Sequence, residues 1–115
     1  MIALNRKYVF HIPLYKHVSG NLIRIEMEDI LDELISQFNE SGFESLYITK
    51  INSYYKKRQF DEMLVTLFSN DDLPCRIFEE WFRKNNDVLR QEAFAYETGN
   101  TMVINDLHLG DLDGR

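Results

Sequence analysis

The sequence has few of the residues that usually reveal a protein's function or its compartment. It contains one cysteine, two prolines and five glycines among 115 residues. No apolar run approaches the roughly 20 residues that a membrane-spanning helix needs. Cys75 has no second cysteine to pair with, which excludes an internal disulfide and fits a reducing, cytoplasmic location. The first residues carry no apolar segment before a small-residue cleavage site, so we expect no secretion signal.

The signature motifs of the common enzyme classes are also missing. The chain has no phosphate-binding loop, no nucleophile elbow, no Cys-x-x-Cys pair and no His-Glu-x-x-His. Acidic residues outnumber basic ones by 19 to 13, and the net charge of −6 argues against a general affinity for nucleic acid. A metal site on His11 and His17 would need a third ligand, and the only other histidine, His108, lies in the predicted tail, so we predict no metal site. We predict no cofactor either.

The bulk composition is that of a globular domain. Apolar residues make up 44% of the chain and charged residues 28%, and a chain of this length can close one hydrophobic core. We expect a single domain over residues 1–104, followed by a polar, glycine-containing flexible tail over residues 105–115.

Alternating side chains predict the strands. Residues 6–16 form the first, and because both of its faces are apolar we expect it to be central, with a bulge or an end near Pro13. The second covers residues 44–53, with a bulge near Thr49–Lys50, and the third begins at Phe60. Residues 91–98 form a further strand, and the turn at Gly99–Asn100 lets residues 101–104 fold back as an extra edge strand.

Two stretches with helical spacing lie between these strands. The first apolar stripe ends at a predicted left-handed cap, Gly42, and the second follows a predicted N-cap within residues 69–72 and ends at Asn85–Asp87. The stripes consist of Met27, Ile30, Leu31, Leu34, Ile35 and Phe38, and of Ile77, Phe78, Trp81 and Phe82.

The elements therefore follow the order β-α-β-β-α-β. This order predicts an α+β, ferredoxin-like fold, with an antiparallel sheet, two helices on one face and an extra C-terminal edge strand. The element order, the size and the opening of the last strand, Arg90-Gln91-Glu92-Ala93, resemble small stand-alone ferredoxin-like proteins of unknown function. They are also similar to the group that pairs two sheets into a dimeric α+β barrel. The resemblance covers residues 6–104 and implies no catalytic residues.

Three residues at the start of the chain are candidate catalytic groups. His11 and Tyr15 are at odd positions of the first predicted strand and would share one face, which His17 joins if the strand extends one residue further. Imidazoles transfer protons near neutral pH. The alternative, which we favour, is a structural histidine on the sheet face beside a loop histidine.

A candidate binding segment follows the second predicted strand. Tyr54, Tyr55, Lys56, Lys57 and Arg58 combine rings that could stack on bases with cations that could hold phosphate. A solvated hairpin whose charges prevent aggregation is the alternative, and we favour it because the chain is acidic overall.

Helices on one face of a sheet leave the other face open. The first and third strands are apolar on both faces, so the open face would carry several large apolar side chains. We therefore predict a homodimer that packs sheet to sheet, and a non-catalytic binding or assembly module acting through this face. A small-molecule ligand is also compatible with the sequence. The alternatives are a cofactor-independent enzyme with a pocket around His11 and Tyr15, and a nucleic-acid binder using residues 54–58.

Overall fold

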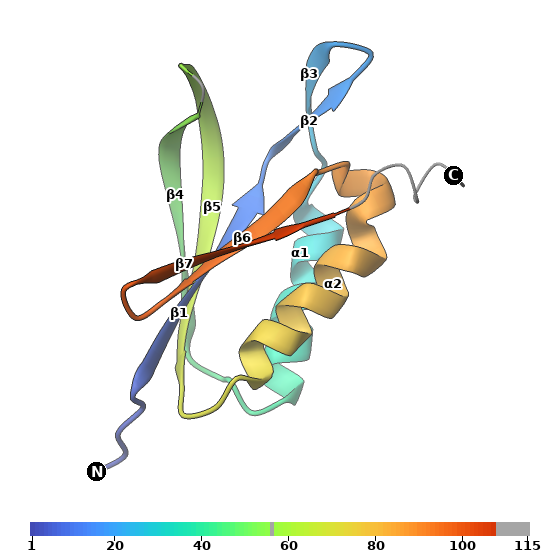
Figure 1. Cartoon of the computed structure of the whole chain (residues 1–115). Coiled ribbons are helices and arrows are strands. Elements are labelled where there is room, and N and C mark those ends of the chain that lie inside the picture. Colours follow the sequence, from blue (N-terminus) through green and yellow to red (C-terminus); the bar gives the residue numbers. More distant parts are fainter. Residues whose placement is uncertain (56, 108–115) are drawn as a thin grey trace.

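The computed structural model describes residues 1–55 and 57–107, which form an α+β fold with two helices and a mostly antiparallel sheet (Figure 1). In chain order the elements are β1 (Arg6–Pro13), β2 (Tyr15–Val18), β3 (Asn21–Arg24), α1 (Glu28–Glu40), β4 (Leu46–Tyr55), β5 (Arg58–Ser69), α2 (Leu73–Leu89), β6 (Ala93–Thr98) and β7 (Thr101–Asp106). No helix in this part of the chain is long and apolar enough to cross a membrane.

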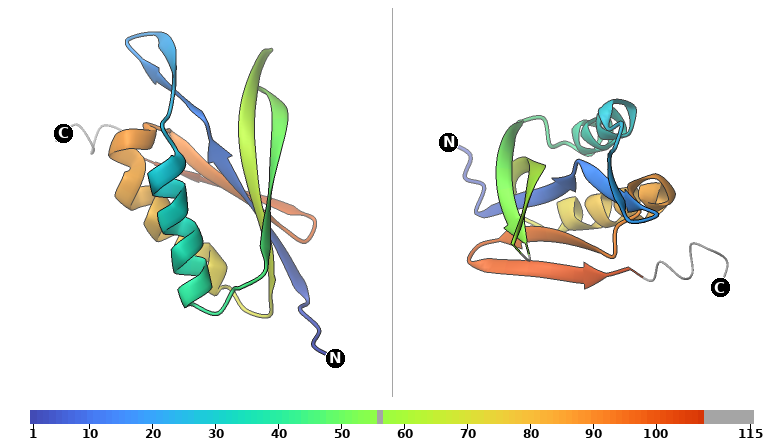
Figure 2. Two further views of the ribbon diagram at one scale, coloured as in Figure 1. Left: turned by 180° about the vertical axis from the view of Figure 1, so that it is seen from behind. Right: turned by 90° about the horizontal axis from the view of Figure 1, so that it is seen from above.

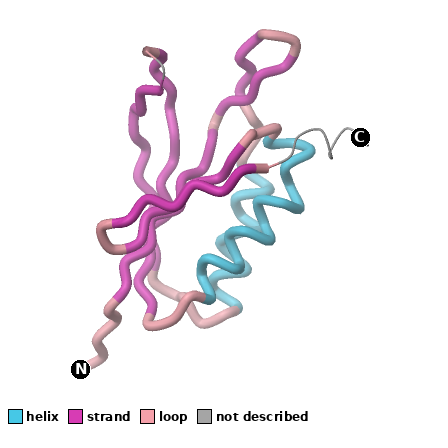
Figure 3. Tube along the Cα trace, viewed as in Figure 1, coloured by secondary structure: helices cyan, strands magenta, loops and turns pink. Residues whose placement is uncertain are grey.

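The main sheet has five strands in the order β4-β5-β1-β6-β7, and β2 and β3 form a separate hairpin. All neighbouring strands are antiparallel. The two helices lie on the same side of the sheet (Figures 2 and 3). β1 and β5, the two strands predicted to be apolar on both faces, each pair with a strand on either side.

The core lies between β1 and the helices. Tyr8, Phe10 and Ile12 of β1 are all buried. The ring centroid of Phe10 is 5.5 Å from that of Phe38 in α1 and 4.7 Å from that of Phe78 in α2. Burial of such aromatic and aliphatic side chains is the main favourable term in folding. The even-numbered side chains of β1 therefore pack against both helices on one face of the sheet. The odd-numbered side chains lie on the opposite, helix-free face.

The first predicted strand is divided in two. β1 ends at Pro13, as the missing N–H of proline predicted, and Tyr15 begins a hairpin outside the main sheet. The hairpin turns through Ser19 and Gly20, with φ angles of 51° and 79°, the positive values that a two-residue type I′ turn requires.

The predicted bulge near Thr49–Lys50 is wrong. β4 and β5 pair continuously, from Leu46 opposite Leu67 to Tyr55 opposite Arg58, and no residue is skipped. The β4–β5 hairpin extends past the helices (Figure 1). The even-numbered residues of β4 are therefore covered by the helices at the start of the strand and face solvent toward its end. Lys50 interrupts the apolar stripe because its position is exposed to solvent, and not because a bulge changes the register of the strand.

The second helix is longer than predicted, because α2 continues through the asparagines to Leu89. Asn85 and Asn86 are buried rather than terminal. The Asn85 side chain donates to the Trp81 carbonyl at 2.9 Å, and Asn86 bonds to both backbone groups of Gln91, at 2.9 and 3.1 Å. These bonds satisfy the side chains that would otherwise favour a turn.

Two predicted glycine turns are confirmed. Gly42 follows α1 with a φ of 97°, and Gly99 connects β6 to β7 with a φ of 55°. β7 runs to Asp106, two residues beyond the predicted edge strand, and the N–H of the buried Leu107 donates to the Glu92 carbonyl at 2.7 Å. The rest of the predicted tail, residues 108–115, lies outside the described residues.

Candidate functional site

A histidine held between two carboxylates lies on the helix-free face of the sheet. His11 Nδ1 is 3.3 Å from Glu62 Oε2, and His11 Nε2 is 2.7 Å from Glu97 Oε2. The His11 side chain is 16% exposed, against 26% for Glu62 and 41% for Glu97. The three residues, here called the His11 cluster, thus form a polar site with a nearly buried centre and more accessible carboxylates.

Strand register brings the His11 cluster together. Pro13 of β1 is opposite Glu62 of β5, and Val9 is opposite Glu97 of β6. Each carboxylate is therefore a diagonal neighbour of His11 on the same face, within reach of a long side chain. Residues far apart in the sequence converge because β1 lies between β5 and β6.

The charges within the cluster favour a protonated imidazole. The hydrogen bond to Glu62 raises the pKa of His11 above its ordinary value of 6.5, burial of the ring opposes the rise, and the hydrogen bond to Glu97 adds to it. Both ring nitrogens can donate at once only in the imidazolium form. The cluster can hold a proton near neutral pH and can accept further hydrogen bonds through its exposed carboxylate oxygens.

Large apolar side chains surround the cluster on the same face. One cross-strand row runs through Tyr47, Thr66, Val9, Glu97 and Met102. Tyr47 is 51% exposed and Met102 49%, and Ile104, two residues further along β7, is 65% exposed. Together with Phe68, these residues make a helix-free face that is apolar around a charged centre.

The other predicted catalytic residues lie elsewhere. Tyr15 is in β2, where its hydroxyl accepts a hydrogen bond from Arg24 Nη1 at 3.3 Å. His17 is exposed in the same hairpin, opposite Leu22. The expectation that Tyr15 and His17 share a face with His11 is wrong, because the chain leaves the main sheet at Leu14.

The predicted binding segment forms the end of the β4–β5 hairpin. Tyr54 is 73% exposed near the end of β4, and Lys57 and Arg58 are exposed beside it. Tyr55 pairs with Arg58 through the backbone. The side chain of Tyr55 and all of Lys56 lie outside the described part of the chain, as does His108.

The pKa of the Cys75 thiol is raised above its ordinary value. Cys75 lies half-buried in the first turn of α2. Burial raises its pKa above the ordinary value, although a hydrogen bond with Tyr96 opposes this. The thiol is thus protonated at neutral pH, which does not suit a nucleophile.

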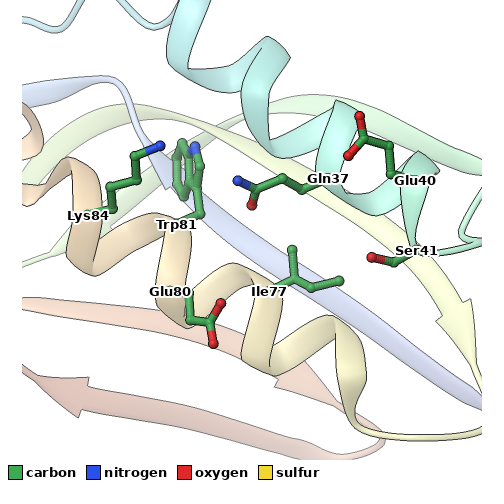
Figure 4. A pocket seen from close by; sticks show the side chains of 7 residues that line it. All are labelled: Gln37, Glu40, Ser41, Ile77, Glu80, Trp81 and Lys84. Atoms are coloured by element: carbon green, nitrogen blue, oxygen red, sulfur yellow. The ribbon is translucent and has the colours of Figure 1, made fainter.

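Two pockets of the described structure are candidates for a ligand site, and neither is lined by His11. The first, of about 290 Å³, lies between the helices and is lined by Ile77, Trp81 and polar residues of α1, its C-cap and α2 (Figure 4). The cation there, Lys84, is paired with Glu33 at 2.6 Å. The second, of about 350 Å³, lies between the β2–β3 and β4–β5 hairpins.

Comparison with known proteins supports the fold. No protein-family model and no curated protein matches the chain. A solved structure described as a phage SAM lyase in complex with S-methyl-5'-thioadenosine is similar over 93% of this chain and 95% of that chain, with a TM-score of 0.50. The likeness is one of fold. At 11% identity it does not extend to residues or activity.

Sequence reasoning identified His11 but missed its partners. Glu97 is the single carboxylate of a largely apolar strand, and Glu62 follows Asp61 at the point where β5 becomes apolar. A charge that interrupts such a strand is a usable signal, because a buried neighbour of opposite sign is one reason for it. To predict that His11, Glu62 and Glu97 meet, one must know which strands are neighbours in the sheet. The sequence gives this order only if a fold is assumed.

Proposed function

We propose that this protein is a binding and assembly module that acts through the helix-free face of its sheet, and that a second copy of the chain covers that face. The observation that supports the proposal is the set of exposed apolar side chains around the His11 cluster. We also infer that the arrangement is ferredoxin-like. Without the β2–β3 hairpin and β7, the elements follow β-α-β-β-α-β and the sheet order is β4-β5-β1-β6.

The size of the face suits a second copy of the chain. Five strands about 4.8 Å apart and about six residues long present roughly 500 Å² in projection. The relief of the side chains brings the accessible area toward the ~800 Å² that each partner buries in an interface of standard size. A two-fold partner presents the same apolar residues, and two-fold dimers are the commonest homo-oligomers.

The His11 cluster would fix the register of such an interface. Its carboxylates still have oxygen lone pairs facing outward, since Glu62 is 26% and Glu97 41% exposed. A partner must supply donors to these oxygens, because unpaired buried charges are costly. The apolar rim would provide the affinity and the charged centre the specificity.

Molar mass in solution tests the proposal. Light scattering at micromolar concentrations should give twice the chain mass of 13.7 kDa. Ile104→Lys, on the helix-free face, should convert the protein to monomers. Ile23→Lys is the matched control, because Ile23 is also exposed, at 42%, but lies on the β2–β3 hairpin. A monomeric wild type, or a dimer that survives Ile104→Lys, would overturn the proposal.

A small enzyme is the second candidate, and the His11 cluster favours it. An imidazole with a raised pKa between two carboxylates can donate a proton to a bound molecule. Tyr15 has no part in this version, because it lies in a different sheet. The fold similarity to a SAM lyase suggests the first substrate to test. Incubation with SAM, followed by mass spectrometry for S-methyl-5'-thioadenosine, should show turnover that is lost in His11→Gln and kept in His17→Gln. Absence of turnover ends this candidate for SAM.

A further inference from the structure

The pocket between the two hairpins is lined by charges of both signs. Its lining residues are Leu14, Arg24, Lys50, Ile51, Asn52 and Asp61. The hairpins extend past the helices at the same end of the molecule (Figures 1 and 3). A volume of about 350 Å³ is at the small end of the ~300–1,000 Å³ typical of ligand sites, so it suits a small molecule.

The arginine of this pocket is held in place without a carboxylate partner. Arg24 Nη1 donates to the Tyr15 hydroxyl at 3.3 Å, and the guanidinium lies 5.7 Å from the centroid of the Tyr15 ring. Within the described residues, Arg24 forms no salt bridge. A positioned guanidinium with free donors is well suited to binding a carboxylate or a phosphate.

The other polar and charged residues lie on the opposite wall, which the β4–β5 hairpin forms. Asn52 of β4 is directly opposite Asp61 of β5, and Lys50 is the diagonal neighbour of Asp61 on the same face. Neither Lys50 nor Asp61 takes part in a salt bridge within the described residues. An acidic chain of net charge −6 thus leaves two cations unneutralised around one pocket, with a single carboxylate beside them.

Two hydrogen bonds anchor the base of the β2–β3 hairpin, which forms one wall of the pocket. The Ile25 N–H donates to the Leu14 carbonyl at 2.8 Å, and Gln91 Nε2 donates to the Tyr15 carbonyl at 2.9 Å. Leu14 is only 3% exposed and gives the pocket an apolar side chain. Arg24 thus projects from an anchored hairpin, and Lys50 and Asp61 project from the paired strands β4 and β5. Such fixed backbone lowers the entropy that a ligand must overcome to bind.

We propose that this pocket binds a small zwitterion of the α-amino acid type with an apolar side chain. Arg24 and Lys50 hold the carboxylate, Asp61 and the Asn52 amide oxygen hold the ammonium, and Leu14 contacts the apolar part. A phosphate would be repelled by Asp61, and a simple cation by Arg24 and Lys50. A zwitterion matches both signs at once. This site is separate from the helix-free face, and its occupant does not depend on the function proposed for that face.

Titration with small probes tests the proposal. We would follow backbone amide NMR signals of the full chain during addition of leucine, methionine or phenylalanine. At least one should give saturable shifts at residues around the pocket, with a dissociation constant of about 1 mM. For the amino acid that binds, the amide derivative, which lacks the carboxylate, and the N-acetyl derivative, which lacks the ammonium, should each bind at least about tenfold more weakly. Inorganic phosphate should give no saturable shift there.

Matched variants locate the site. Arg24→Gln and Asp61→Asn should each weaken binding about fivefold or more, whereas Lys16→Gln and Asp32→Asn, which remove charges outside the pocket lining, should leave it unchanged. The proposal is overturned if none of the three amino acids saturates by about 20 mM. It is equally overturned if the derivatives bind as well as the parent, if phosphate binds, or if the control variants weaken binding as much.

Discussion

Asp61 and Glu62 are consecutive in the sequence but serve different sites. Side chains of a strand alternate between its two faces, so Glu62 faces His11 on the helix-free face and Asp61 lines the pocket between the hairpins. A one-residue shift of β5 would exchange them and disrupt both sites. The continuous pairing of β5 with β1 and β4 therefore also keeps Glu62 and Asp61 at their separate sites.

The protonation of His11 should make stability depend on pH. His11→Gln removes the charge and should lower the free energy of unfolding by about 1 kcal/mol at pH 6, since charge-assisted hydrogen bonds contribute about 1.5–3 kcal/mol and the exposure of Glu97 reduces this. The folded-state pKa lies above the ordinary 6.5. The stabilisation is thus complete below that value and is lost as pH rises through the folded-state pKa.

Chemical denaturation at several pH values would measure this effect. The difference between wild type and His11→Gln should be largest near pH 6 and shrink toward pH 9. His17→Gln is the control, because the His17 side chain is exposed and forms no hydrogen bond within the described residues. A difference that stays constant across this range would contradict a charged His11.

At the scale of elements, Asp71 rather than Asp72 caps the start of α2. Asp71 Oδ1 accepts hydrogen bonds from the Leu73 N–H at 3.0 Å and from the Ser69 hydroxyl at 3.2 Å. The N-cap residue by position is Asp72, but its side chain makes no capping bond. Asp71→Ala should cost about 1 kcal/mol in thermal or urea unfolding. Asp72→Ala should cost less than about 0.5 kcal/mol, since its salt bridge with Arg76 is exposed. Equal losses would show that the cap is assigned to the wrong residue.

The end of α2 depends on a buried side chain. Asn86 is 2% exposed and holds both backbone groups of Gln91. Asn86→Ala should destabilise the protein by about 2 kcal/mol, because it leaves these groups without partners. Asn39→Ala is the control on α1, where the side chain is exposed and should change the midpoint of urea unfolding little. A loss for Asn86→Ala as small as that of the control would show that water replaces the side chain.

At the scale of the whole molecule, charge opposes the nucleic-acid hypothesis. The cations at the end of the β4–β5 hairpin belong to a chain of net charge −6, and phosphate affinity depends on clustered cations. We expect no micromolar binding of mixed-sequence single-stranded RNA or DNA at moderate salt, measured by fluorescence anisotropy. Micromolar affinity that falls steeply with salt, and that disappears when Lys56, Lys57 and Arg58 are all replaced by glutamine, would contradict this.

Local patterns predicted much of the fold. Pro13 ends β1, Gly42 follows α1 and Gly99 turns β6 into β7, because each depends on the backbone preferences of one or two residues. The predicted end of the second helix failed because a local preference competed with tertiary contacts. Asn85 and Asn86 favour turns on their own, but buried hydrogen bonds keep them in α2.

The sequence by itself determined the order of the main elements, the two helical stripes and the placing of His11 on a strand, since these depend on periodicity within a few residues. Only the tertiary structure decided that His11 lies between Glu62 and Glu97, that Tyr15 belongs to a separate hairpin, and that Arg24 faces Lys50 and Asp61 across a pocket. The physical reason is that a site made by several strands depends on which strands are neighbours and in what register. That choice is made by the packing of the whole core, which no local stretch of sequence encodes.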